Sequence, residues 1–138
     1  MMKDKLEFVV ARLLRWQADE DAAHRKRGGR CLEALRHALG EAGLHLPISN
    51  VDYPGMSAVT CGKTLLKDPG KWNWKQVGSS VGIPLPRYTL VFFKATLLNR
   101  HGHVGILDLE KKLLYSNLKT CAYAKGWQKR LFVAFTPL

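Results

Sequence analysis

The sequence lacks several features that would place it in common classes of protein. It has no uninterrupted run of the ~18–20 apolar residues that a membrane-spanning helix requires. Its N-terminus, Met1 to Glu7, shows no apolar stretch followed by a small-residue cleavage site, so we expect synthesis in the cytoplasm without a signal peptide. The chain carries no internal repeat and no low-complexity segment. We therefore expect a single domain over residues 1–138, with no membrane span.

Cysteine is too scarce for a disulfide framework. The three cysteines are Cys31, Cys61 and Cys121, an odd number without CxxC spacing. This pattern excludes a complete set of intramolecular disulfides and does not suggest a zinc ribbon. At least one thiol stays free or pairs between molecules, and we expect no bound metal.

Acidic residues are also few. The chain has 22 Lys and Arg against 11 Asp and Glu, which gives a net charge of +11. This charge predicts a polyanionic neighbour: nucleic acid, an anionic membrane face, or an acidic polymer such as bacterial cell wall. Charge alone does not choose among them. The composition is otherwise ordinary, 46% apolar and 24% charged, and the chain is long enough to bury a core.

The first half of the chain predicts three helices, because apolar residues recur there at helical spacing between recognisable caps. Two of these helices are separated by a basic segment, residues 24–30, in which two glycines favour a turn. The first predicted helix is capped by Asp4 and ends at about residues 17–22. The second spans roughly Cys31 to Ala42 and is terminated by Gly43. The third is capped by Ser57 and continues to Leu65.

From Pro86 onward, the sequence changes to short runs rich in β-branched and aromatic residues, which are typical of strands. Their short connections predict an antiparallel meander, and residues 76–86 are expected to form a loop. Helices followed by strands predict an α+β fold, in which the N-terminal helices pack on one face of a small antiparallel sheet. The predicted strands are Tyr88–Phe93, Gly102–Leu107, Lys112–Tyr115 and Arg130–Phe135.

Cys31 and His103 are candidates for the nucleophile and the base of a cysteine hydrolase. Cys31 opens the second predicted helix, where free backbone N–H groups and the helix dipole favour the thiolate. His103 opens a predicted strand, and such pairs become neighbours through the fold rather than along the chain. His101, two residues away on the same face, is the alternative base. Cys61 is a rival nucleophile, but it lies about one turn inside its helix and is expected to pack in the core.

Four segments of the chain resemble the NlpC/P60 and CHAP group of papain-like cysteine peptidases and amidases, which cut bacterial peptidoglycan. They lie within residues 28–135 and are Gly29–Leu35, Ala42–Pro47, Leu85–Phe93 and His103–Ile106. The resemblance implies a papain-like fold with a catalytic core over residues 28–138, preceded by an N-terminal helix and basic loop over residues 1–27. It implies Cys31 as nucleophile and His103 as base. In place of the Asp and Ser of the usual Asp-Cys-Ser-Gly motif, this chain has Arg30 and Leu32.

The same resemblance implies a polar residue on the next strand that orients the histidine. The candidates are Tyr115, Ser116 and Asn117. Asn117 is preferred, since its side-chain carbonyl can accept a hydrogen bond from the second imidazole nitrogen, and Tyr115 is the reserve.

Substrate binding is expected from residues around this triad. Arg30 belongs to the basic segment that could hold a substrate carboxylate, and Tyr115 is expected near the substrate. Trp72 and Trp74 either line a groove for sugar or peptide or pack in the core. No cofactor is expected.

The sequence thus predicts hydrolysis of peptide or amide bonds in peptidoglycan or its stem peptides, without distinguishing hydrolysis from acyl transfer. Together with the absence of a signal peptide, the resemblance implies non-classical delivery to the cell wall, either as an antibacterial effector or as a phage lysis protein. An immunity protein or a delivery protein would then be a partner. The alternative is a basic nucleic-acid-binding or adaptor domain without catalysis, using the charge and the two tryptophans.

Overall fold

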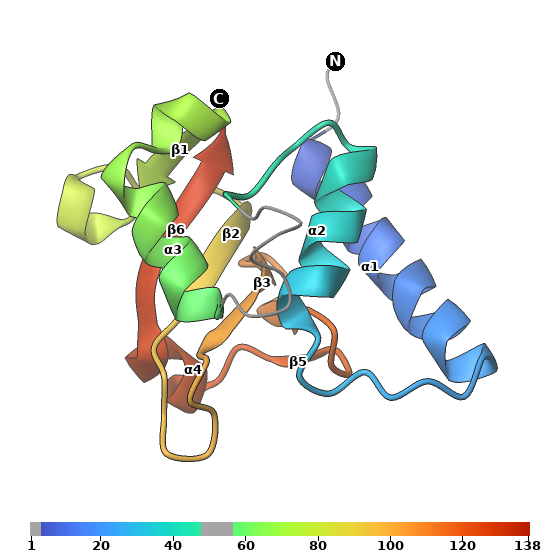
Figure 1. The fold of residues 1–138 in the computed structure, drawn as a ribbon. Helices are drawn as coiled ribbons and strands as arrows, with labels where there is room; N and C mark the ends of the chain where they lie inside the picture. Colours follow the sequence, from blue (N-terminus) through green and yellow to red (C-terminus); the bar gives the residue numbers. More distant parts are fainter. Residues whose placement is uncertain (1–3, 48–56) are drawn as a thin grey trace.

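The protein is an α+β structure in which helices cover an antiparallel sheet whose strands differ in length (Figure 1). The computed structural model describes residues 4–47 and 57–138. Its helices are α1 (Lys5–Ala22), α2 (Cys31–Glu41), α3 (Ala58–Lys67) and α4 (Lys125–Arg130), with short 3₁₀ turns η1 (Pro69–Trp72) and η2 (Ser79–Val81). Its strands are β1 (Trp74–Val77), β2 (Tyr88–Phe93), β3 (His103–Asp108), β4 (Leu113–Tyr115), β5 (Cys121–Ala122) and β6 (Leu131–Pro137). The predicted α+β class is confirmed.

The three predicted helices form, and the N-caps of α1 and α3 are made by the expected side chains. The Asp4 carboxylate accepts a hydrogen bond from the Leu6 N–H at 2.8 Å, and the Ser57 hydroxyl accepts one from the Thr60 N–H at 3.1 Å. Gly43, just beyond α2, has a φ of +74°, the left-handed conformation that ends helices. Within the residues that the structure describes, no helix is both long and apolar enough to cross a bilayer.

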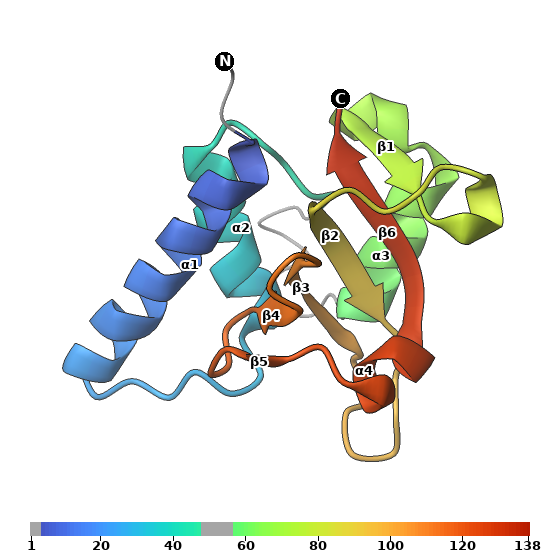
Figure 2. The same cartoon turned by 180° about the vertical axis from the view of Figure 1, so that it is seen from behind.

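The sheet has the strand order β1-β6-β2-β3-β4-β5, and its neighbouring strands are antiparallel. Strands β2 to β5 follow one another as the predicted meander. The expectation is wrong for β6, which returns across the sheet to pair with β2 on one side and β1 on the other (Figure 2). Sequence patterns indicate which segments are strands, but the pairing of β6 depends on contacts that are distant along the chain.

Three elements were not predicted: β1, β5 and α4. Strand β1 reaches into the segment expected to be a loop, and its polar Lys75 and Gln76 hide its pairing with β6. Strand β5 has two residues and α4 has six, which is too short for a periodic pattern to be visible.

Two apolar clusters cover the two faces of the sheet. The first cluster joins α1, α2 and α3 to one face, where it includes Phe92 and Val104. The second cluster includes Phe93 on the other face, with Trp127 of α4 packed against it. Because successive side chains of a strand point to opposite faces, His103 and Val104 lie on different sides of the sheet. This alternation decides the geometry of the candidate site.

Candidate active site

Cys31 is the first residue of α2 and borders a pocket of about 220 Å³. The side chain of Arg30, at the N-cap, makes no capping hydrogen bond, so it leaves the first N–H groups of the helix to other partners. The backbone N–H groups of Leu32 and Val104 interact with the Cys31 sulfur and favour its charged form. The predicted placement of a thiol at a helix N-terminus is therefore present in the structure.

The expectation of a low-pKa thiolate is wrong, because Cys31 packs against the first apolar cluster. Burial raises the pKa of the thiol above its usual value, and the neighbouring N–H groups offset this effect only in part. Desolvation disfavours the charged sulfur more strongly than these dipoles favour it. At neutral pH the thiol is therefore protonated, and a nucleophilic role requires a base that removes its proton.

His103 is among the residues that border the Cys31 pocket, but its ring does not face the thiol. This ring lies on the opposite face of the sheet, with centroid distances of 5.2 Å to Trp127 and 6.2 Å to Phe93. Burial, followed by the charge of Arg130, lowers the pKa of His103 to about 4. Its Nε2 atom is buried and has no hydrogen-bond partner in the described part of the chain. The side chain on the α2 side of the sheet is therefore that of Val104, and the expected contact between the His103 imidazole and the Cys31 thiol is absent from the described structure.

His101, the alternative base, borders the same pocket as Cys31. Its carbonyl oxygen accepts a hydrogen bond from the Val59 N–H at 3.0 Å, which ties it to the start of α3. The next residue, Gly102, has a φ of +72°, and a Cβ atom there would lie 2.4 Å from Val59 Cγ2 and 2.5 Å from the Phe93 carbonyl oxygen. Gly102 thus interrupts the strand alternation, so the expectation that His101 and His103 share a face does not hold.

Asn117 borders the pocket but makes a different contact from the one expected. Its side-chain amide donates to the Arg27 carbonyl oxygen at 2.6 Å, and the Arg27 guanidinium donates to the Asn117 carbonyl oxygen at 3.0 Å. Its Oδ1 atom is buried and has no hydrogen-bond partner among the residues that the structure describes. Asn117 therefore holds the loop that precedes Cys31, and its amide does not orient His103.

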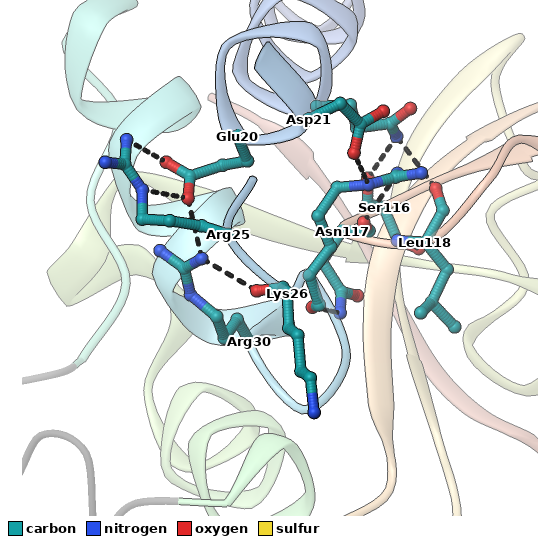
Figure 3. Close-up of polar contacts among 10 residues, drawn as sticks. Glu20, Asp21, Arg25, Lys26, Arg30, Ser116, Asn117 and Leu118 are labelled. Carbon is teal, nitrogen blue, oxygen red and sulfur yellow. Dashed lines mark hydrogen bonds and ion pairs between the residues drawn. The ribbon is translucent and has the colours of Figure 1, made fainter. Parts of the chain in front are cut away.

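A second contact holds the same turn to α1 (Figure 3). The Gln17 side-chain amide donates to the carbonyl oxygens of Ser116, at 2.6 Å, and Leu118, at 2.8 Å. Arg27 also pairs with Asp21 near the end of α1 at 3.0 Å. The N-terminal helix, the basic loop and the turn after β4 are thus one hydrogen-bonded unit around the pocket.

Arg30 is engaged by carboxylates of the protein itself. Its guanidinium donates to Glu20 at 2.8 Å (Figure 3). It also pairs with Glu33 and lies 4.9 Å from the centre of the Trp16 ring. Hydrogen bonds from Arg25 and then Arg30 lower the pKa of Glu20 to about 2. The expected capture of a substrate carboxylate by Arg30 would have to compete with these ion pairs.

The expected substrate-binding aromatic residues do not border the Cys31 pocket. Trp74 is 1% exposed, and its indole N–H donates to the His45 carbonyl oxygen at 2.8 Å, so it is a core residue. Tyr115 is also buried in the first cluster. Trp72 is half-buried against that cluster, with the Lys71 ammonium 5.6 Å from its ring centre. For the two tryptophans, packing is the alternative that the structure favours.

The other two cysteines do not line this pocket. Cys61 has no exposed surface, and burial, with a smaller effect from Cys31, raises its pKa to about 12. Cys121 is half-buried against the second cluster. The pocket wall also contains residues that the sequence did not single out as site residues, because no local pattern marks them; they include Glu33, Ser57, Asn99 and Leu118.

Comparison with protein-family models, curated proteins and solved structures finds no match to this chain. The Cys31 pocket combines a thiol, the N–H groups of a helix N-terminus and two histidines, and acyl transfer uses groups of these kinds.

Proposed function

We propose that the protein is a cysteine hydrolase that cleaves peptide or amide bonds, with Cys31 as nucleophile and His101 as base. One observation supports this proposal above the others: the thiol at the start of α2 borders a pocket that is also lined by two histidines, His101 and His103. The resemblance to NlpC/P60 and CHAP enzymes adds the substrate class, which is peptidoglycan or its stem peptides. The net charge of +11 suits such an acidic polymer.

In the proposed reaction, His101 takes the thiol proton as the Cys31 sulfur attacks the carbonyl carbon of the substrate. The N–H groups at the start of α2 donate hydrogen bonds to the oxyanion that forms. His101 then gives the proton to the departing amine, which leaves an acyl-enzyme. Water, deprotonated by His101, attacks this thioester, and the products are a carboxylic acid and the restored thiol.

His101 is preferred to His103 for two physical reasons. The His103 ring packs between aromatic side chains on the far face of the sheet, and burial lowers its pKa to about 4, so it is a weak base. His101 is exposed at the pocket. A base must come within hydrogen-bond reach of the proton it removes, and this requirement comes before its pKa.

The test is digestion of purified peptidoglycan, with the released fragments identified by mass spectrometry. Cys31→Ser and His101→Ala should each reduce the rate by at least ~100-fold. His103→Phe, which keeps an aromatic ring in its apolar site, and Cys121→Ser should leave the rate within about threefold of the wild-type value. A fully active Cys31→Ser protein would overturn the proposal, and loss in folded His103→Phe with normal activity in His101→Ala would overturn the choice of base.

Alkylation gives a second measurement that does not need the substrate. Because the pKa of the Cys31 thiol is raised, labelling by iodoacetamide should be slow at pH 7 and should still be increasing at pH 9. Cys61, which has no exposed surface, should react after unfolding. Salt-sensitive DNA binding that is unchanged in Cys31→Ser, together with no hydrolysis, would favour the non-catalytic nucleic-acid-binding function instead.

A further inference from the structure

The loop between β2 and β3 presents two adjacent leucines to solvent. The exposed fraction is 99% for Leu97 and 102% for Leu98, the highest values among the exposed large apolar residues of the described chain. A single exposed leucine is common on protein surfaces. Two complete leucine side chains at the tip of a protruding loop form an apolar knob, and contiguous exposed apolar surface is a feature that interaction sites share.

The loop is closed by its own hydrogen bonds, so it holds the knob in place. The Thr96 N–H donates to the Asn99 carbonyl oxygen at 2.8 Å, and the Asn99 N–H donates back to the Thr96 carbonyl at 3.2 Å. The Thr96 hydroxyl also accepts from the Asn99 N–H at 3.0 Å. Polar groups that are paired within the loop carry a smaller desolvation cost when the tip enters an apolar medium.

Basic residues surround the base of this knob. Lys94 and Arg100 flank the tip and are exposed. The Lys94 N–H donates to the Arg130 carbonyl oxygen at 2.7 Å, which places the end of α4 beside the loop, at the end of the molecule opposite the C-terminus (Figures 1 and 2). Helix α4 adds exposed Lys125 and Lys129.

The surrounding sequence has little acid to neutralise this positive charge. Residues 69–138 contain eleven Lys and Arg residues but two acidic residues, Asp108 and Glu110. Both acidic groups interact with Arg87 at the far end of β3, at 3.2 Å and 3.1 Å. The segment from Lys94 to Leu107 contains no Asp or Glu. The loop therefore has an apolar tip, formed by Leu97 and Leu98, and a collar of basic residues around its base, formed by Lys94, Arg100, Lys125 and Lys129.

We propose that this loop docks the protein on an anionic phospholipid bilayer. Leu97 and Leu98 enter the boundary between headgroups and acyl chains, while Lys94, Arg100 and the lysines of α4 lie among the lipid phosphates. Nucleic acid would use the collar but gains little from aliphatic leucines, so the combination favours a membrane. The proposal does not depend on catalysis. It also has a geometric consequence, because Asn99 and His101 belong to the same loop and border the Cys31 pocket, which would lie close to the bilayer.

The experiment is sedimentation of the full chain with vesicles of phosphatidylcholine alone or mixed with phosphatidylglycerol. The wild-type protein should bind the mixed vesicles, and Leu97→Ser/Leu98→Ser should lower its partition coefficient about tenfold or more. The control for a single substitution, Leu97→Ser, is Leu138→Ser, which changes a 73% exposed leucine at the other end of the molecule. The Leu138→Ser variant should bind the mixed vesicles as the wild-type protein does. Because these side chains are exposed, circular dichroism should show that all variants fold.

Binding by the double leucine variant equal to that of the wild-type protein would overturn the proposal, since charge alone would then account for the interaction. So would the absence of vesicle binding, or a wild-type oligomer that the double variant dissociates, which would make the knob an interface between copies of the chain. Cys31→Ser should bind vesicles normally. Failure of the membrane proposal can thus be distinguished from failure of the proposed hydrolase.

Discussion

The side-chain amide of Asn117 and the guanidinium of Arg27 each donate a hydrogen bond to the carbonyl oxygen of the other residue, at 2.6 Å and 3.0 Å. The two residues lie 90 positions apart in the sequence. Their reciprocal pairing fixes the loop before Cys31 to the turn after β4. The wall of the pocket therefore depends on a contact between the two halves of the chain.

Replacing Asn117 should destabilise the fold. Asn117→Ala removes the donor to the Arg27 carbonyl oxygen and leaves a cavity at a position that is 1% exposed. We expect the free energy of unfolding to fall by about 1–3 kcal/mol, measured by urea denaturation at pH 7.

Gln128→Ala is the matched control. It removes the same kind of bond, from a side-chain amide to the Tyr123 carbonyl oxygen at 3.1 Å, but at an exposed site. Its effect should be below about 0.5 kcal/mol. An equal loss in both variants would contradict the role assigned to Asn117.

His103 should make the stability of the protein depend on pH. Burial lowers its pKa from 6.5 to about 4 in the folded protein, so the unfolded chain takes up a proton at a higher pH than the folded one. The free energy of unfolding should therefore decrease as the pH falls from about 6.5 toward 4. His103→Phe should remove this part of the slope between pH 7 and pH 5 in urea denaturation.

The control for this measurement is His37→Gln, which changes an exposed histidine on α2. This variant should keep the wild-type slope. An identical slope in wild-type protein and His103→Phe would show that His103 is not buried in its neutral form.

Gly102 should tolerate no side chain. Gly102→Ala would place a Cβ atom against Val59 and the backbone of Phe93, at a φ of +72°. We expect a loss of at least about 2 kcal/mol in the free energy of unfolding. Gly28→Ala, where nothing lies within 4 Å of the added atom, should change stability by less than about 0.5 kcal/mol. Similar values for the two variants would contradict the close packing at the His101–His103 turn.

The sequence predicted the elements whose signals are local. Asp4 and Ser57 cap their helices as expected, because an N-cap depends on residues within one turn. The boundaries of β2 coincide with the predicted run Tyr88–Phe93. Strand β6 was predicted as a strand, but its position between β1 and β2 was not. That position depends on pairing with strands that are distant along the chain, which a local pattern does not indicate.

The candidate site was predicted in part, and the differences have physical causes. The position of Cys31 at a helix start followed from Arg30 to Leu35 alone, but its raised pKa depends on packing by residues that are remote in sequence. The face of the sheet on which the His103 ring lies depends on the alternation of side chains along β3. A shift of one residue in that alternation would place the ring on the other face. The bond between Asn117 and Arg27 involves backbone groups, which no side-chain pattern encodes.

The central place of β6 has a consequence for how the protein is made. During synthesis, β1 and β2 emerge early, yet each must wait for residues 131–137 before its edge is covered. Until then, the nascent chain exposes two unpaired strand edges, one of them the aromatic β2, and such edges invite pairing with other chains. Residues 131–137, synthesised after the strands that they pair with, thus complete the middle of the sheet, and the interval before they emerge is when we expect the protein to depend most on chaperones.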